Sequence, residues 1–249
     1  MKTNHVLKHD VDFKTADLGS DDINNFCLSH FSKSEWEEHT FYIFDKFRDK
    51  SKTFLDMGGW LGITPLYASF KFRDVIAFEC DEVALKRFKM NLKCNPNITN
   101  VEICEKAIWN KNGTLTFGHK TDGELGDSES SVHFGKNGEF YVESITFLNA
   151  MKYYKKNLRD IGFIKIDIEG AEAEVIKDMK GYISMFKPTI YLSIHHHLLT
   201  ESEVENMILL LFSIYSSRQV FDSNGKSMEV TKEAIIENKL GDCVFTQLR

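Results

Sequence analysis

Short apolar runs alternate with amphipathic stretches from residue 53 to the end of the chain, and few folds accommodate that alternation. Apolar runs bounded by polar residues indicate buried strands, and apolar residues at helical spacing indicate helices that cover them. Strands are expected at 53–57, 75–78, 101–104, 163–168, 189–194, 219–222 and 243–248. Helices are expected at about 62–72, 82–94, 143–158, 171–185 and 201–217. Roughly one helix per strand predicts an α/β fold, with a seven-stranded, mostly parallel sheet and helices on both faces.

The chain outside this alternating pattern carries weaker signals. Residues 1–33 are mixed and polar, and we interpret them as an N-terminal extension. Ser34 and Glu37 have the spacing of a capping box, which predicts a helix over about 35–49. We therefore divide the chain into an extension with a capping helix at 1–50 and a main domain at 51–249. The polar stretch 119–137 predicts a loop or mobile hairpin, which fits a lid, a binding loop or a surface insertion.

The composition excludes several classes of protein. A hydrophobic fraction of 42% and a charged fraction of 27% are those of a soluble globular protein rather than a disordered one. The net charge of −6, without a basic run, disfavours nucleic acid as a partner, so we expect a small-molecule substrate. The longest apolar run, 207–212, is far shorter than the ~20 residues of a membrane-spanning helix. The N-terminus lacks a secretory signal, so we expect a cytoplasmic protein with no membrane partner.

A turn containing glycine follows the first expected strand. Asp56, Gly58 and Gly62 have the spacing Asp-x-Gly-x-x-x-Gly. Glycines let the backbone approach a ligand closely, and the first amides of the next helix can bind a polar group. A dinucleotide fingerprint would need glycine where this chain has Trp60, and no phosphate-loop lysine follows. The spacing is also found in simple tight turns. It resembles the first motif of Rossmann-like S-adenosylmethionine-dependent methyltransferases, which implies that Asp56 and the turn hold the methionine end of that cofactor.

Two more positions follow neighbouring strands. Glu79 comes after the strand at 75–78, where a carboxylate can accept two hydrogen bonds from a ribose diol. Its alternative role is to balance the dipole of the helix at 82–94. Ala107 comes after the strand at 101–104 and would give an adenine ring a flat wall, or simply pack beneath the loop. Both positions join the predicted cofactor site.

The strand at 163–168 carries two charges among three isoleucines. An isolated buried charge costs several kcal/mol, so Lys165 and Asp167 should be paired or face a cavity. Open α/β sheets bind ligands at the carboxyl ends of their strands. That rule places Asp167 near the reactive sulfonium of the cofactor and Glu169 at the lip of the site.

The segment 164–172 resembles the signature segment of the FkbM family of methyltransferases. The other motifs follow in the family's order, with Cys80 replacing a proline, Asn149 in place of an aspartate and Ser193 replacing a glutamate. The resemblance covers about 53–195. It implies a Rossmann-like class I methyltransferase fold with a C-terminal antiparallel strand, S-adenosyl-L-methionine as cofactor, and methyl transfer to a hydroxyl of a sugar or another secondary metabolite.

Three consecutive histidines follow the strand at 189–194. Side chains alternate along an extended segment, so at most two of them could converge on one ion, and no complete ligand set is present. The five cysteines are scattered, without a Cys-x-x-Cys pair, and indicate neither a disulfide framework nor a zinc cluster. The loss of the family's glutamate at Ser193 also weakens any metal dependence. We therefore assign no metal site.

The chemistry of methyl transfer to a hydroxyl needs a group that takes the proton. His195 should neighbour Asp167 if their strands are adjacent, and an imidazole with a pKa near ~6.5 can accept a proton at neutral pH. We predict His195 as the general base, with Asp167 as the next candidate. Glu169 and His196 are predicted to contact the substrate, although His196 and His197 also fit solvated loop residues.

Other functions fit parts of the sequence. A non-catalytic cofactor-binding scaffold would keep the glycine turn without needing Asp167 and His195. An RNA methyltransferase would need a basic aromatic patch, and a nicotinamide dehydrogenase conflicts with the glycine spacing. We therefore predict an O-methyltransferase that acts on a sugar or nucleotide-linked sugar in polysaccharide or secondary-metabolite biosynthesis. The N-terminal helix could cover the substrate side of the sheet or form a homo-oligomer contact.

Overall fold

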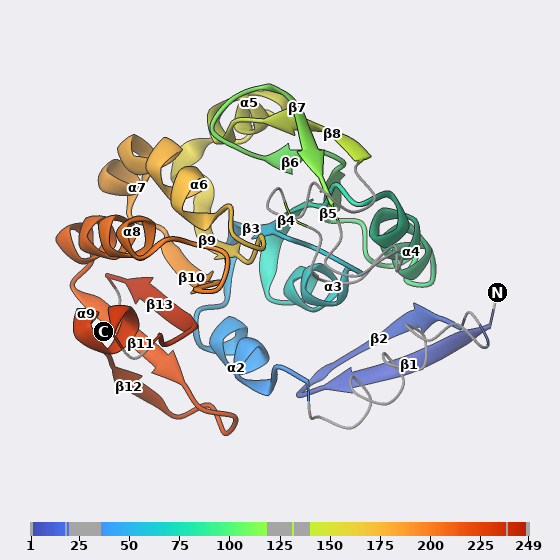
Figure 1. Ribbon diagram of the computed structural model, residues 1–249. Helices are drawn as coiled ribbons and strands as arrows, with labels where there is room; N and C mark the ends of the chain where they lie inside the picture. Colours follow the sequence, from blue (N-terminus) through green and yellow to red (C-terminus); the bar gives the residue numbers. More distant parts are fainter. Residues whose placement is uncertain are drawn as a thin grey trace.

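The computed structural model describes residues 2–17, 19, 36–118, 131, 140–237 and 239–247, and its centre is an eight-stranded sheet (Figure 1). In spatial order the strands are β12 (Ser227–Glu229), β11 (Ser217–Phe221), β13 (Asp242–Thr246), β10 (Thr189–Ser193), β9 (Ile161–Ile166), β3 (Asp49–Met57), β4 (Phe72–Phe78) and β5 (Val101–Cys104). The run from β10 to β5 is parallel, and β13 is antiparallel to both β10 and β11. The expected α/β sheet with an antiparallel C-terminal strand is therefore confirmed.

The sheet differs from the expectation in the number of its strands and in the residues at which they begin. An eighth strand, β12, pairs with β11, and its three residues are too short and polar to be recognised as a strand. β3 begins at residue 49 rather than 53, because its first residues are exposed and carry no apolar pattern. The predicted loop at 119–137 lies outside the described residues, apart from Ser131.

Two smaller sheets were not expected. A hairpin is formed by β1 (Thr3–Lys8) and β2 (Val11–Ala16) in the stretch we interpreted as an irregular extension. A three-stranded sheet has the order β6 (Ala107–Ile108), β8 (Phe140–Ile145) and β7 (Gly113–Phe117). The strands of both sheets are short or alternate between buried and exposed positions with polar residues among them, so their apolar pattern is weak.

The helices form at the expected places with corrected ends. They are α2 (Glu38–Lys46), α3 (Ile63–Ser69), α4 (Glu82–Lys93), α5 (Phe147–Tyr153), α6 (Glu172–Asp178), α7 (Lys180–Phe186) and α8 (Glu201–Ile214), with a 3-10 turn, η2, at Leu158–Asp160. A further short helix, α9 (Lys232–Ile236), was not expected. The helix expected at 143–158 is shorter because its first residues belong to β8, and Thr146 caps α5 by accepting from the amide of Asn149. The helix expected at 171–185 is divided at Met179 into α6 and α7.

The start of α2 also differs from the expectation. Its N-cap is Glu37, whose backbone has the left-handed φ of 44°, and no side chain caps the helix. Ser34, the other half of the expected capping box, lies outside the described residues. The expected role of Glu37 as the capping-box glutamate is therefore wrong.

Two hydrophobic clusters cover the two faces of the sheet. The side chains of adjacent residues in one strand pack on opposite faces of the sheet, as those of Phe54 and Leu55 in β3 do. One cluster contains residues of α5 to α8, while the other joins the hairpin, α2 and α3, and Figure 1 shows these groups on opposite sides of the sheet. Phe44 of α2 packs edge-on against Phe54, with ring centroids 4.9 Å apart. The N-terminal elements thus share a core with the central strands.

Asp45 links the N-terminal hairpin to α2 and α3, and its loss should weaken the fold. Its carboxylate accepts from Tyr67 Oη and Lys71 Nζ, both at 2.8 Å, and lies 2.5 Å from His9 Nδ1. Asp45→Asn is expected to lower the free energy of unfolding by about 1–3 kcal/mol, because part-buried donors lose a charged acceptor. Urea denaturation at pH 7 measures this loss, with the exposed Asp12→Asn as the control.

The same substitution should change how stability depends on pH. Burial raises the pKa of Asp45, but hydrogen bonds from Lys71, His9 and Tyr67 lower it more, so the pKa lies below its ordinary value. A carboxyl with a lowered folded pKa stabilises the fold above its unfolded pKa of ~3.9 and loses that contribution as the pH falls through the folded value. The advantage of the wild type over Asp45→Asn should therefore shrink below about pH 4. A difference that stays constant across pH would contradict this role.

Candidate active site

A cavity of about 350 Å³ opens at the carboxyl ends of β3, β4, β9 and β10. It is lined by the glycine turn after β3, by Glu79 after β4, by Asp167 and Glu169 after β9, and by His195 after β10. Its volume falls within the range of sites that hold small molecules and cofactors. The sheet thus brings together residues that are more than 130 positions apart in the sequence.

The two glycines of the turn are required by contacts within the protein. Gly58 has a φ of 89°, and a Cβ there would lie 1.8 Å from the backbone oxygen of Asp167. Gly62 has a φ of 84°, and a Cβ would lie 2.2 Å from the ring of Phe88. From the sequence we expected these glycines to allow close approach of a ligand. The structure shows a different reason: the turn packs directly on the end of β9 and on α4.

Glu79 is fixed in place by backbone amides. Oε1 accepts from the amides of Cys80 and Asp81, and Oε2 accepts from the amide of Trp60, each at 2.8 Å. A carboxylate has about four acceptor positions, so the described residues leave one position on Oε2 rather than the two that we expected for a ribose diol. Burial raises the pKa of Glu79 to about 7, although the amides oppose this shift.

The alternative role expected for Glu79, to stabilise the start of the next helix, is performed by Asp81. Asp81 is the N-cap of α4 and accepts from the amides of Val83 and Ala84 at 2.9 Å. Two orphan donors of the helix are therefore satisfied without Glu79. Ala107, in β6, lines the cavity as expected of a wall residue, and it is 7% exposed.

Lys165 holds two carboxylates and the glycine turn together. Its Nζ lies 3.0 Å from Asp167 Oδ2 and 3.3 Å from Asp56 Oδ1, and donates to the backbone oxygen of Gly58 at 3.1 Å. Burial lowers the pKa of Lys165, but Asp167 and Asp56 raise it more, so the amine stays charged. The expected pairing of the charges in this strand is confirmed.

Asp56 lies beneath the cavity rather than in its lining. Its side chain is fully buried, and Oδ2 accepts from Thr64 Oγ1 at 2.6 Å. Burial raises the pKa of Asp56, while Lys165 and Thr64 oppose the shift. Asp56 therefore supports the glycine turn through Lys165, and the expected direct contact with a cofactor does not follow from its position.

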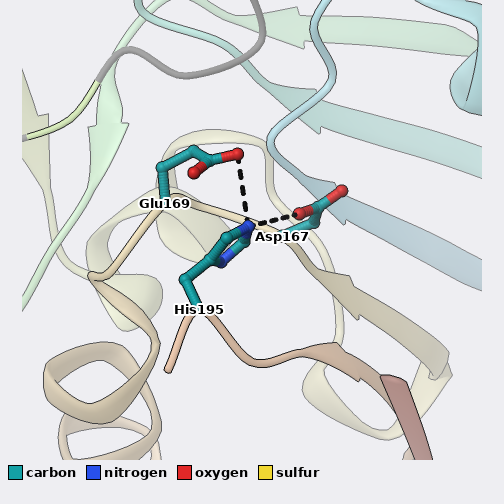
Figure 2. Close-up of side chains that lie close together, drawn as sticks. All are labelled: Asp167, Glu169 and His195. Carbon is teal, nitrogen blue, oxygen red and sulfur yellow. Dashed lines mark ion pairs between the residues drawn. The ribbon is translucent and has the colours of Figure 1, made fainter. Parts of the chain in front are cut away.

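His195 lies between three carboxylates, two of which are drawn in Figure 2. Nδ1 lies 2.7 Å from Glu172 Oε1, and Nε2 lies 3.2 Å from Glu169 Oε1 and 3.6 Å from Asp167 Oδ1. The expected adjacency of His195 and Asp167 is confirmed, since β9 and β10 are parallel neighbours. Glu172 was not predicted as a site residue, because an acidic residue in the first turn of a helix carries no sign of a partner on another strand.

The pKa of His195 lies above the value of ~6.5 on which its predicted role as a base rests. Burial lowers its pKa, but hydrogen bonds to Glu169 and Glu172 have a larger, opposite effect and raise the pKa to about 10. The imidazole therefore carries a proton at neutral pH in this arrangement. The role of His195 as general base stays a prediction, and the sequence could not show that carboxylates occupy both sides of its ring.

Residues at the start of α2, in β10 and in β13 complete the site and were missed. Glu37, Tyr191 and Asp242 line the cavity, and His39 Nε2 lies 3.1 Å from Tyr191 Oη and 3.4 Å from Asp242 Oδ2. Burial and the charge of Asp167 raise the pKa of Glu37 to about 7. No local motif marks these residues, since only the tertiary fold brings α2 and β13 to the end of β10.

His196 does not line the cavity. Its Nε2 lies 3.1 Å from the backbone oxygen of Leu240, so the expected substrate contact is not found. His197 is exposed, as expected of a loop residue.

Within the described ranges, no helix is long and apolar enough to cross a membrane.

The sheet order and the cavity at the carboxyl ends of the strands define a class I S-adenosylmethionine-dependent methyltransferase fold. The family profile described as "Methyltransferase FkbM domain" matches residues 27–223. The chain therefore belongs to the FkbM methyltransferase family, and S-adenosylmethionine is its cofactor.

Solved structures resemble the chain at low sequence identity. The methyltransferase FkbM from Methylobacillus flagellatus KT superposes with a TM-score of 0.53 and 15% identity, over 90% of this chain and 52% of that one. An rRNA methylase from Streptococcus thermophilus gives a TM-score of 0.44 and 10% identity, over 84% and 94%. A Streptococcus mutans protein in complex with SAH gives 0.45 and 11%, over 83% and 92%.

The chain thus spans about half the length of the Methylobacillus protein. That likeness shows the fold alone, and the two lower scores carry no argument about substrate. A comparison with curated proteins found no significant match.

Proposed function

We propose that this methyltransferase transfers the methyl group of S-adenosylmethionine to a hydroxyl of a small molecule, with a sugar as the acceptor. The observation that carries this proposal is the lining of the cavity. Besides Glu79 and the helix cap Asp81, four carboxylates line it: Glu37, Asp167, Glu169 and Asp242. Carboxylates accept hydrogen bonds from hydroxyl groups and repel phosphates, which favours a polyhydroxylated acceptor over RNA. The phosphates of a nucleotide-linked sugar would have to lie away from these carboxylates.

The described residues fit the cofactor. The free acceptor position on Glu79 Oε2 suits a ribose hydroxyl, Ala107 offers an uncrowded wall, and Asp167 supplies a negative charge that favours a sulfonium. Gly58 and Gly62 shape the turn beside them, and Asp56 supports it through Lys165. We therefore propose Glu79, Ala107 and Asp167 as direct contacts and the other three as supports.

When bound, S-adenosylmethionine supplies a methyl group on a sulfonium that is already activated for transfer. The chain has to orient the acceptor oxygen and take its proton. Glu37 lines the cavity, and its pKa of about 7 matches a base that works at neutral pH. We propose that the hydroxyl proton passes to Glu37 as the oxygen–methyl bond forms and the carbon–sulfur bond breaks.

Methyl transfer from labelled cofactor to a panel of sugars, sugar nucleotides and an RNA oligonucleotide tests this proposal. The wild type should methylate a member of the sugar group, with a rate that rises with pH through about 7 as Glu37 loses its proton. Glu37→Gln should lower the rate by about 10²–10⁴-fold, because the amide cannot accept the proton, and should leave cofactor affinity unchanged in calorimetry.

Glu82→Gln, an exposed glutamate at the start of α4, is the control and should behave as the wild type. Methyl transfer to the RNA alone would contradict the proposed acceptor. Full activity in Glu37→Gln would contradict the proposed base.

A further inference from the structure

Three side chains that commonly bind metals converge in the cavity, as Figure 2 shows. Asp167, Glu169 and His195 each offer one ligand atom, and these atoms all lie within 4.8 Å of one another. We propose that they form a binding site for a divalent cation that holds the acceptor hydroxyl. This use of the cation rests on the proposed function, whereas binding of the cation does not.

The imidazole is oriented in the manner of a metal ligand, and a cation that binds Nε2 would take the place of the proton that this nitrogen otherwise carries. Glu172 Oε1 lies 2.7 Å from Nδ1, so Nε2 is directed toward Asp167 and Glu169. A carboxylate on the far ring nitrogen is the usual way in which proteins fix the tautomer and direction of a ligating histidine. Glu172 is itself held, because its Oε1 also accepts from the amide of Gly170 at 3.1 Å.

A buried oxygen without a partner supports the same inference. The side chain of Glu172 is 0% exposed, and among the residues that the structure describes its Oε2 has no hydrogen-bond partner. An unpaired buried carboxylate oxygen is costly, and positive charge on the neighbouring imidazole or a bound ion offsets that cost. Glu172, which directs the ring of His195, therefore has a carboxylate whose negative charge is only partly compensated by the described residues.

The charge around the cavity also favours a cation. Eight carboxylates lie in or beneath it, and they face the ammonium groups of Lys106 and Lys165 and the imidazoles of His39 and His195. The carboxylates are Glu37, Asp56, Glu79, Asp81, Asp167, Glu169, Glu172 and Asp242. The site stays negative even when both imidazoles carry a proton. A divalent cation would bring the site closer to neutrality.

The spacing of the ligands indicates the class of ion. Ligands about 2.1 Å from a metal in octahedral geometry are about 3 Å apart, and Nε2 lies 3.2 Å and 3.6 Å from the two carboxylate oxygens. Two carboxylates and one imidazole, without a thiolate, suit Mn²⁺ or Mg²⁺ better than a soft ion. Three protein ligands leave coordination positions for hydroxyl oxygens, and a hydroxyl bound to a metal loses its proton more readily.

We assigned no metal from the sequence because the consecutive histidines and the scattered cysteines offer no complete ligand set and Ser193 replaces the family's glutamate. The ligands instead come from two neighbouring strands, with Asp167 and Glu169 two residues apart after β9 and His195 after β10. Their convergence follows from the parallel pairing of these strands, which a search for ligand spacing within one segment does not detect.

Titration of the purified protein with Mn²⁺, followed by the electron paramagnetic resonance signal of free Mn²⁺, tests the site without an activity assay. We expect one Mn²⁺ per chain, displaced by excess Mg²⁺. His195→Ala and Glu169→Gln should each weaken binding at least 10-fold, and Glu172→Gln should weaken it about 10–100-fold by releasing the ring. His197→Ala, which changes the exposed histidine two residues away, is the matched control and should bind as the wild type.

Circular dichroism of each variant establishes that it is folded, and Glu169→Gln keeps the test decisive if His195→Ala does not fold. No binding by the wild type at millimolar Mn²⁺, or equal binding by His195→Ala and Glu169→Gln, would overturn the site and leave only ion pairs there. Cofactor binding measured on the same samples separates the two proposals. A protein that binds and uses S-adenosylmethionine but not Mn²⁺ refutes the metal site alone, and one that binds Mn²⁺ but methylates no acceptor refutes the proposed function alone.

Discussion

Replacing Gly58 with alanine should lower the free energy of unfolding by about 3–5 kcal/mol. The new Cβ would lie 1.8 Å from the backbone oxygen of Asp167, and the left-handed φ of 89° is unfavourable for any other residue. Strain of this kind costs about 1–3 kcal/mol, and overpacking costs about 1–3 kcal/mol more. Urea denaturation measures the loss. Calorimetry should show weaker cofactor binding as well, because the turn must move away from β9.

The chain supplies a matched control for this substitution. Gly181 lies in α7 without a left-handed φ, and a Cβ there would meet no atom within 4 Å. Gly181→Ala should leave stability unchanged or raise it by up to about 1 kcal/mol, because alanine favours a helix. If Gly58→Ala lowered the free energy of unfolding by less than about 1 kcal/mol, the turn would not need glycine in order to pack on β9.

Lys165→Met should destabilise the fold by about 3–5 kcal/mol, because it leaves Asp56 as a buried charge without its ion-pair partner. Adding Asp56→Asn to this variant should recover at least half of the loss, since the amide still accepts from Thr64 without carrying a charge. Lys177→Met, at a side chain that is 77% exposed, is the control and should change stability by less than about 0.5 kcal/mol.

The loss in Lys165→Met should depend on pH in a defined direction. Burial already raises the pKa of Asp56, and Lys165 opposes that shift. Without Lys165 the folded pKa rises further above the unfolded value, so the penalty is greatest at high pH and shrinks as the pH falls toward ~3.9. A penalty that grows at low pH would show that Asp56 is not the group left uncompensated.

The central sheet could be predicted because its strands carry their own signal. Three isoleucines around Lys165 mark a buried strand, and the two charges in it required a partner, which the structure supplies in Asp56 and in the pairing of Lys165 with Asp167. The helices were also recognisable, although their ends depend on details such as the cap at Thr146. These features follow from hydrophobic periodicity over a few residues.

The parts that could not be predicted depend on contacts between distant segments. The N-terminal hairpin is held by Val6 and Phe13 in the cluster that contains Phe41, and its own apolar pattern is too weak to indicate strands. Glu37 resembles a capping residue in the sequence, but the fold brings it into the cavity. The protonation of His195 depends on Glu169 and Glu172 together, a geometry that no spacing rule describes.

The position of β13 has a consequence for synthesis of the chain on the ribosome. β13 pairs with β10 on one side and β11 on the other, although β11 precedes it by some twenty residues. Until Asp242–Thr246 has emerged, the facing edges of β10 and β11 have unpaired backbone groups. A nascent chain that stalls before β13 would therefore leave these two strand edges open to pairing with other chains, and it would lack Asp242, which lines the cavity.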